Sequence, residues 1–135
     1  MANTAKKGFE GLEIYRLSET LADMVWEMVL RWGQLAQDTV GKQLVRAADG
    51  IGANIAEGTG RGTYVDHRRF VDMARGSLYE TTHWLRRAYR RRLVQAGETT
   101  KLKPVLEELK PRLNAYRNSL TARIRRPKKQ IPNNK

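Results

Sequence analysis

Gln43-Leu-Val-Arg-Ala-Ala-Asp-Gly-Ile-Gly-Ala-Asn-Ile-Ala-Glu-Gly-Thr-Gly-Arg61 is the stretch that decides the fold of this chain. Its apolar residues recur every three or four positions, which is the spacing of one buried face of a helix. These residues are Leu44, Ala47, Ala48, Ile51 and Ile55. Gly50 and Gly52 lie inside the predicted helix, where each costs about 1 kcal/mol relative to alanine. We therefore expect a neighbouring helix to approach the backbone closely at these glycines.

Polar residues accompany the apolar face of this helix and of the helix predicted after it. The set comprises Arg46, Asn54, Glu57, Arg61, Ser77 and Glu80. Carboxylates near a core must be paired or hydrogen-bonded, and the arginines, the asparagine and the serine supply partners. We interpret the set as a structural polar network that fixes the register of the helices. A catalytic cluster is the alternative.

Residues 43–61 and 74–80, together with Phe9-Glu-Gly-Leu-Glu-Ile-Tyr15, carry a family resemblance. They resemble the bacterial four-helix-bundle family first noticed as proteins encoded in 23S ribosomal RNA intervening sequences. The resemblance implies an all-α, antiparallel up-down-up-down bundle and assembly into homo-oligomeric rings, often pentamers. Related bundle proteins serve as accessory factors of diversity-generating retroelements, in which a basic barrel engages the reverse transcriptase and its template RNA. A reverse transcriptase is therefore a candidate partner.

The apolar periodicity itself predicts four amphipathic helices with short connections, for which an up-down-up-down bundle is the natural architecture. We expect helices over residues 12–35, 40–57 and 64–95, and a fourth that is capped by Thr99 or Thr100 and fades after about residue 124. The first should bury Leu35, and Asp38 or Thr39 should cap the second. Residues 63–66 have the form of a capping box.

Pro111 should kink the fourth helix or divide it in two, because proline removes a backbone hydrogen bond. The domain limits follow from the same pattern. We expect a flexible lead-in over residues 1–10, the bundle over 11–125, and a basic, disordered tail over 126–135.

Several large apolar residues lie beside the main stripes, namely Val25, Trp26, Val29, Trp32 and Trp84. Two interpretations remain open. These residues either widen the core or form an apolar surface for a neighbouring subunit.

The composition excludes several classes of protein. The 135 residues suit one domain, and the absence of cysteine excludes disulfides and thiolate metal sites. No apolar run approaches the length of a membrane span, and no signal peptide is evident. We expect a cytoplasmic protein without contact with a membrane.

No motif indicates an enzyme, a metal site or a cofactor. His67 and His83 are the only histidines, and no serine or acid accompanies either in a hydrolase-like arrangement. The spacing of Glu80 and His83 matches half of a di-iron motif, which requires two such pairs and two further glutamates. Residues 58–62 join two helices and lack the lysine of a phosphate loop.

The positive charge is concentrated in two segments without acidic residues. The net charge is +12, with five arginines in residues 81–97 and nine lysines or arginines in residues 109–135. Arginine suits phosphate groups, and Tyr89 among the arginines can stack on a base. We predict nucleic-acid binding, RNA in preference to DNA, through backbone or shape. The predicted residues are Arg86, Arg87, Arg90, Arg91, Arg92, Arg117, Arg123, Arg125, Arg126, Lys128 and Lys129. The alternative is a scaffold for an acidic partner protein.

Overall fold

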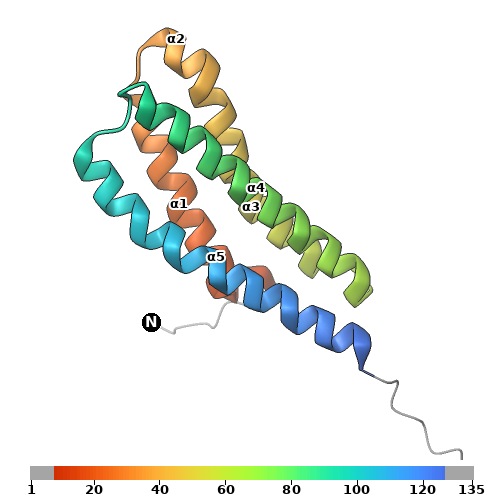
Figure 1. Ribbon diagram of the computed structural model, residues 1–135. Helices are drawn as coiled ribbons and strands as arrows, with labels where there is room; N and C mark the ends of the chain where they lie inside the picture. Colours follow the sequence, from red (N-terminus) through yellow and green to blue (C-terminus); the bar gives the residue numbers. More distant parts are fainter. Residues whose placement is uncertain (1–7, 127–135) are drawn as a thin grey trace, which may run out of the picture.

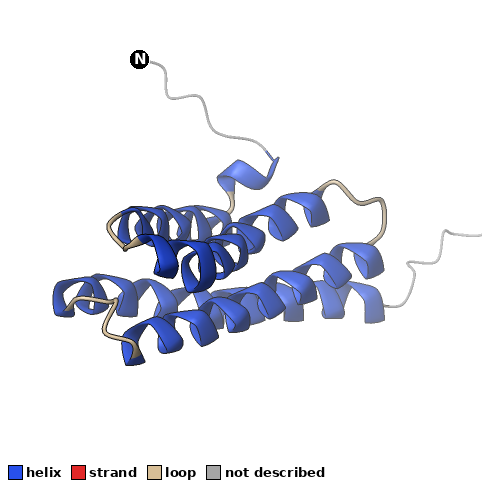
Figure 2. Cartoon of the chain, turned by 90° about the horizontal axis from the view of Figure 1, so that it is seen from above, coloured by secondary structure: helices blue, strands red, loops and turns tan. Residues whose placement is uncertain are grey.

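The computed structural model describes residues 8–126, which form four long helices and no strand (Figure 1). The long helices are consistent with a four-helix bundle, joined by short loops in the view of Figure 2. In chain order the elements are η1 (Gly8–Gly11), α1 (Glu13–Leu30), α2 (Gln34–Ala36), η2 (Gln37–Gly41), α3 (Lys42–Thr59), α4 (Tyr64–Arg90) and α5 (Ala96–Arg125). The elements α2, η2 and α3 are contiguous, so residues 34–59 form one helical run with a π turn inside it.

The four long helices enclose one hydrophobic core. Helix α3 packs against α1 and α4, and α5 packs against α4 and α1. The core takes residues from every long helix, among them Leu21, Leu44, Ile51, Val71 and Leu109, all fully buried. No helix in residues 8–126 is both long and apolar enough to cross a membrane.

Glycines in α3 permit the close helix contacts that the sequence predicts. A Cβ atom on Gly50 would lie 3.0 Å from the Ser77 Oγ of α4, and one on Gly52 would lie 2.9 Å from the Ser18 Oγ of α1. Gly58 meets α4 in the same way, because its Cβ would lie 3.1 Å from that of Phe70. The expected close approach at Gly50 and Gly52 is confirmed.

The boundary between the first two predicted helices lies earlier than expected. Helix α1 ends at Leu30, and Gly33 adopts an extended conformation (φ −70°, ψ 168°) before α2 begins. Thr39 is therefore inside a helix rather than capping one, and its hydroxyl donates to the carbonyl of Leu35 at 2.7 Å. Asp38 is likewise not a cap but a partner of Gln34. Leu35 was expected in the core and is 79% exposed, because it belongs to the next helix.

The later helix ends also differ in part from expectation. Helix α4 ends at Arg90 rather than at residue 95. Helix α5 begins at Ala96 with Gln95 and Glu98 as a reciprocal capping box, so neither Thr99 nor Thr100 is the cap. At the start of α4, the Thr63 hydroxyl accepts from the Asp66 amide at 3.1 Å, which is one of the two hydrogen bonds of the predicted capping box.

Pro111 does not divide the last helix. Helix α5 runs unbroken from Ala96 to Arg125. Pro111 is exposed, as is Glu107, whose carbonyl loses its helical partner. That carbonyl can be hydrated, which lowers the cost of an interior proline.

The apolar residues beside the main stripes mostly widen the core. Val25, Val29 and Trp32 are buried, and Trp84 is partly buried against the core, whereas Trp26 is 53% exposed. The Trp32 Nε1 also donates to the carbonyl of Leu93 at 3.0 Å, which attaches the loop after α4 to the end of α1.

Candidate nucleic-acid interface

The end of α4 carries the densest positive charge in the described residues. We call Arg86, Arg87, Arg90, Arg91 and Arg92 the α4 arginine cluster. Arg87 is half-buried and the other four are exposed. Within residues 8–126, none of the five forms an ion pair, whereas Arg16, Arg61, Arg69 and Arg112 each pair with a carboxylate one turn or less away. The cluster is therefore free to bind an external anion.

The cluster ends in an unusual backbone conformation. Arg92 has a φ of 63°, and it is the only non-glycine residue of the described range with positive φ. The amide of Leu93 donates to the carbonyl of Ala88 at 2.9 Å, and the amide of Arg92 donates to the carbonyl of Tyr89 at 3.0 Å. This is the Schellman arrangement of a helix end, in which the residue at the position of Arg92 is usually glycine.

The structure separates the predicted basic residues into two groups at opposite ends of the molecule (Figure 1). The Arg123 guanidinium lies 3.3 Å from the Tyr64 hydroxyl at the start of α4. Helix α4 has 27 residues, so the two groups are separated by about 40 Å at a rise of about 1.5 Å per residue. Arg125 and Arg126 are exposed beside Arg123, and Lys128 and Lys129 lie outside the described residues.

Arg117 lies between the two groups and already has an acidic partner. Its guanidinium donates to both carboxylate oxygens of Asp72, and Arg75 lies 3.6 Å from the same carboxylate. The hydrogen bond to Asp72 raises the pKa of Arg117 above its ordinary value. This ion pair joins α4 to α5, and sequence spacing alone does not reveal it.

The predicted polar network is divided into separate contacts. Asn54 donates to the carbonyl of Gly50 at 2.9 Å and lies 3.5 Å from the Ser77 hydroxyl. Arg46 and Glu80 are both exposed. Glu80 accepts from the Trp84 indole at 3.4 Å.

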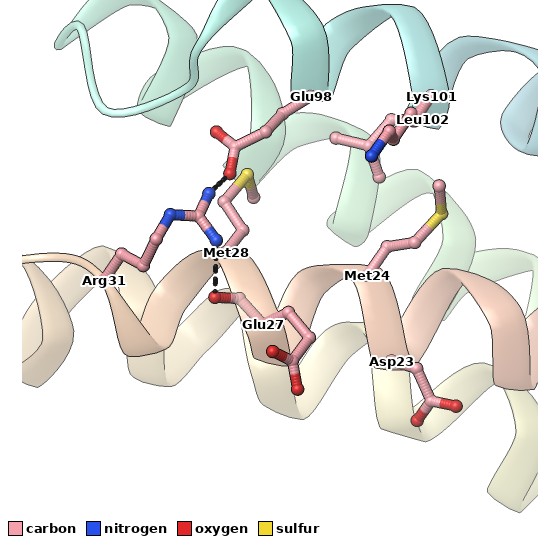
Figure 3. Close-up of a pocket in the computed structure, with 8 residues that line it drawn as sticks. All are labelled: Asp23, Met24, Glu27, Met28, Arg31, Glu98, Lys101 and Leu102. Carbon is pink, nitrogen blue, oxygen red and sulfur yellow. Dashed lines mark hydrogen bonds and ion pairs between the residues drawn. The ribbon is translucent and has the colours of Figure 1, made fainter.

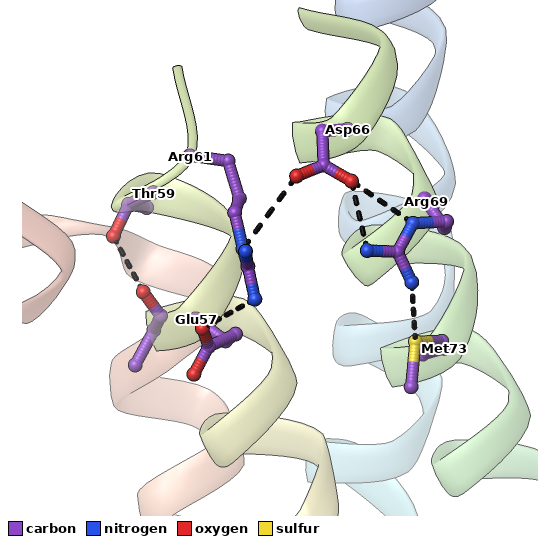
Figure 4. Close-up of polar contacts among 7 residues, drawn as sticks. Glu57, Thr59, Arg61, Asp66, Arg69 and Met73 are labelled. Atoms are coloured by element: carbon purple, nitrogen blue, oxygen red, sulfur yellow. Dashed lines mark hydrogen bonds and ion pairs between the residues drawn. The ribbon is translucent and has the colours of Figure 1, made fainter. Parts of the chain in front are cut away.

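The remaining pair, Glu57 and Arg61, belongs to a chain of charges that joins α3 to α4 (Figure 4). Arg61 lies 2.7 Å from Glu57 and 3.6 Å from Asp66, which in turn lies 2.8 Å from Arg69. Both arginines also stack on the Phe70 ring, at 4.4 and 4.5 Å from its centroid. The sequence prediction did not include Asp66 and Arg69 in the polar network, because only the turn between the helices brings Asp66, the partner of Arg69, next to Arg61.

The two histidines have separate surroundings. The His67 Nε2 lies 3.2 Å from the Tyr116 hydroxyl, and burial, aided by the charge of Arg123, lowers the pKa of His67. His83 is exposed and stacks edge-on against Trp84 with ring centroids 4.8 Å apart. Residues 8–126 contain no group of three histidine or acidic side chains that could hold a metal ion.

A hollow of about 310 Å³ lies between α1 and α5 (Figure 3). Arg31 forms an ion pair with Glu98 there and donates to the carbonyl of Glu27 at 2.9 Å. The other charged side chains of the hollow are Asp23, Glu27 and Lys101. Acidic groups outnumber basic ones, so this hollow is not suited to phosphate.

Three arginines of the cluster, Arg86, Arg90 and Arg92, line hollows between α4 and α5. The described residues thus define an all-α helical bundle with an unpaired basic surface at one end. The chain belongs to the family of 23S rRNA-intervening sequence proteins, whose model matches residues 10–115.

The solved structures include a similar fold. A protein with unknown function from the S23 ribosomal protein family of Bacteroides thetaiotaomicron has a TM-score of 0.67 and 18% sequence identity to this chain. The match covers 76% of this chain and 96% of that protein. The comparison with curated proteins gave no match.

Proposed function

We propose that this protein is a non-enzymatic, nucleic-acid-binding bundle that contacts RNA through the α4 arginine cluster. The observation that carries the proposal is the lack of acidic partners around five arginines within residues 86–92. Residues 81–97 contain no acidic residue, and within residues 8–126 the cluster makes no ion pair. Unpaired guanidinium groups supply the phosphate contacts that dominate non-specific nucleic-acid affinity. The preference for RNA over DNA rests on the family resemblance, in which related bundle proteins engage a template RNA.

We include oligomer formation in the proposal. The side chains of Trp26, Leu30 and Leu35 are 53, 54 and 79% exposed. These apolar side chains near the C-terminal end of α1 support a contact surface for a second copy of the chain. A homopentameric ring of up-down-up-down bundles would repeat the arginine cluster around its circumference and increase avidity without new contacts. Gly52 of α3 lies close to Ser18 of α1, and Gly50 of α3 lies close to Ser77 of α4. Helices that follow one another in the chain are therefore neighbours, which supports the up-down-up-down arrangement.

The cellular role proposed from the family resemblance is that of an accessory factor to a reverse transcriptase of a diversity-generating retroelement. The alternative is a scaffold for an acidic partner protein. The same basic surface supports both, and salt dependence and nucleic-acid content distinguish them. The genes next to this one distinguish the nucleic-acid roles. An adjacent reverse transcriptase gene would favour the retroelement role, and a surrounding ribosomal RNA operon would favour a role connected with ribosomal RNA.

Binding of labelled RNA at several salt concentrations tests the proposal. The logarithm of the association constant should fall linearly with the logarithm of salt concentration, by about 0.7 to 0.9 per phosphate contact. The purified protein should carry nucleic acid, visible as a high ratio of absorbance at 260 to 280 nm. Replacing Arg86, Arg87, Arg90 and Arg91 with glutamate should abolish binding while circular dichroism remains helical.

A matched pair of variants separates the cluster from net charge. Arg86→Gln with Arg90→Gln removes two charges from the cluster, and Arg16→Gln with Arg112→Gln removes two that are paired with Glu13 and Glu108. The first pair should weaken binding and reduce the salt slope, and the second should change it little. Equal effects would mean that general charge, not the cluster, attracts RNA. Clean protein that shifts no RNA or DNA at low salt would refute the proposal.

A further inference from the structure

A groove runs along the seam between the second half of α4 and the first half of α5. It consists of three adjoining hollows of about 400, 530 and 600 Å³. The first two share Thr82, Leu106 and Glu107, and the last two share Tyr89, Val94 and Thr99. The three hollows therefore adjoin one another along this half of the seam, and together we call them the α4–α5 groove.

Each wall of the groove is a single stripe of one helix. Positions 79, 82, 86 and 89 form the α4 wall, and positions 99, 103, 106 and 110 form the α5 wall. Both stripes repeat every three or four residues, so each follows one side of its helix. Between them lie apolar side chains, among them Leu78, Leu85 and Leu102. The groove thus offers an apolar surface to a ligand that lies along the helices.

The rim of this apolar surface is positive. Its basic side chains are Arg86, Arg90, Arg92, Lys103 and Lys110, and Glu107 is the one acidic side chain among the described lining residues. An apolar surface bordered by cations fits a ligand with flat apolar groups on an anionic backbone. A double helix does not present such groups, because its bases are stacked on one another inside the backbones.

Two tyrosines stand on the α4 wall as exposed aromatic surfaces. Tyr79 and Tyr89 are 53 and 60% exposed. The Lys110 ammonium lies 5.2 Å from the centroid of the Tyr79 ring. Ten residues of helix separate the two rings, which is about 15 Å along the axis. At about 3.4 Å per nucleotide of a stacked strand, this distance corresponds to four or five nucleotides.

The end of the groove is formed by Arg92, the residue with positive φ. A side chain other than glycine in this conformation costs about 1–2 kcal/mol. Glycine would end α4 without that cost but would supply no charge. Backbone strain of this kind is typical of functional sites. The strain at Arg92 therefore indicates a role for its side chain, which lines the same hollow as Tyr89.

We infer that the α4–α5 groove binds single-stranded nucleic acid, with bases stacked on Tyr79 and Tyr89 and phosphates on the basic rim. This inference rests on the proposed function and adds the form of the ligand and the two aromatic residues. Stacking on aromatic side chains beside basic groups is the general means by which proteins hold single strands. It requires no particular base, in agreement with the absence of base-reading side chains in the sequence prediction.

The test compares tyrosine variants for binding of a labelled 12-nucleotide oligo(U), the matching oligo(dT), and a 12-base-pair RNA duplex. Tyr79→Ala and Tyr89→Ala should each weaken single-strand binding by about tenfold or more, with little change in the salt slope because no charge is removed. Tyr89→Phe keeps the ring and should retain the affinity. Tyr64→Ala is the matched control, because Tyr64 is 48% exposed at the opposite end of α4. The duplex should bind more weakly than the single strand.

The outcomes separate this inference from the proposed function. If single strands bind but neither tyrosine variant differs from Tyr64→Ala, the groove is not the site, while nucleic-acid binding remains. If the duplex binds as tightly as the single strand and independently of the tyrosines, the same conclusion holds. If no oligonucleotide binds, and poly-L-glutamate binds in a manner that depends on Tyr89, the groove accepts an acidic peptide and both proposals fail. Circular dichroism and melting of each variant exclude loss of folding as the cause.

Discussion

Replacing Arg92 with glycine should make the protein more stable. Arg92 occupies the left-handed position of the Schellman motif that ends α4, with a φ of 63°. This conformation costs a non-glycine residue about 1–2 kcal/mol. Glycine avoids the cost, although its freedom in the unfolded chain returns about 0.5–1 kcal/mol of destabilisation. The net expected gain is about 0.5–1 kcal/mol, since Arg92 has no ion-pair partner within residues 8–126 to lose.

Urea unfolding followed by circular dichroism measures this gain. With a slope of about 2 kcal/mol per molar urea, the midpoint should rise by about 0.3–0.5 M. Protein concentration must be the same in every sample, because association shifts apparent stability. Arg92→Gly should at the same time weaken single-strand binding, because the charge at the end of the groove is lost.

Arg91→Gly is the matched control for this prediction. Arg91 is the neighbouring residue and has an ordinary φ of −93°. Glycine there relieves no strain and should destabilise the protein by about 0.5–1 kcal/mol. An Arg92→Gly protein that is no more stable than the parent, or an Arg91→Gly protein that gains as much, would show that the backbone at Arg92 is not strained.

Three further predictions concern the packing and the charges of the bundle. Gly76→Ala should stabilise the protein by about 0.5–1 kcal/mol, since nothing lies within 4 Å of the added Cβ. Gly58→Ala should lower the melting temperature, because its Cβ would lie 2.9 Å from the His67 ring. A higher melting temperature for Gly58→Ala than for Gly76→Ala would contradict this packing. Asp72→Asn should cost roughly 1 kcal/mol or less, because the pair with Arg117 is partly exposed, and equal losses in low and high salt would argue against an ionic origin. Burial lowers the pKa of His67 below its ordinary value of 6.5. The unfolded state therefore binds more protons, and the free energy of unfolding should fall as the pH drops through and below about 6.5. His67→Gln should remove this part of the pH dependence, and a variant with the same pH profile as the parent would contradict the prediction.

Helix packing was predictable where it depends on local periodicity. The stripe from Leu44 to Ile55 predicted a buried helix, and Gly50 and Gly52 predicted close contact with neighbours, because both features repeat at the spacing of one helix face. Helix ends were less predictable. Gly33 ends the first helix early through an extended conformation, and Gln95 rather than a threonine caps the last one. Caps depend on a few hydrogen bonds of comparable energy, which a sequence pattern does not rank.

The candidate site was predictable in composition but not in arrangement. A count of charges identified the arginines from Arg86 to Arg92 as a basic segment. The pairing of Arg117 with Asp72 and the separation of Arg123 from the α4 cluster depend on how α5 lies along α4. The importance of Tyr79 could not be read from the sequence, because the other wall of its groove comes from residues about thirty positions later, such as Lys110.

By itself, the sequence determined the helical class, the family and the two basic segments without acids, since these depend on periodicity, motif and composition along one chain. The tertiary structure alone decided which arginines remain unpaired and that the two basic groups lie at opposite ends of the bundle. It also decided that three arginines of the α4 cluster border a groove with two exposed tyrosines. The physical reason is that charge pairing and groove shape depend on distances between helices. Those distances are set by the packing of side chains that are far apart in the sequence.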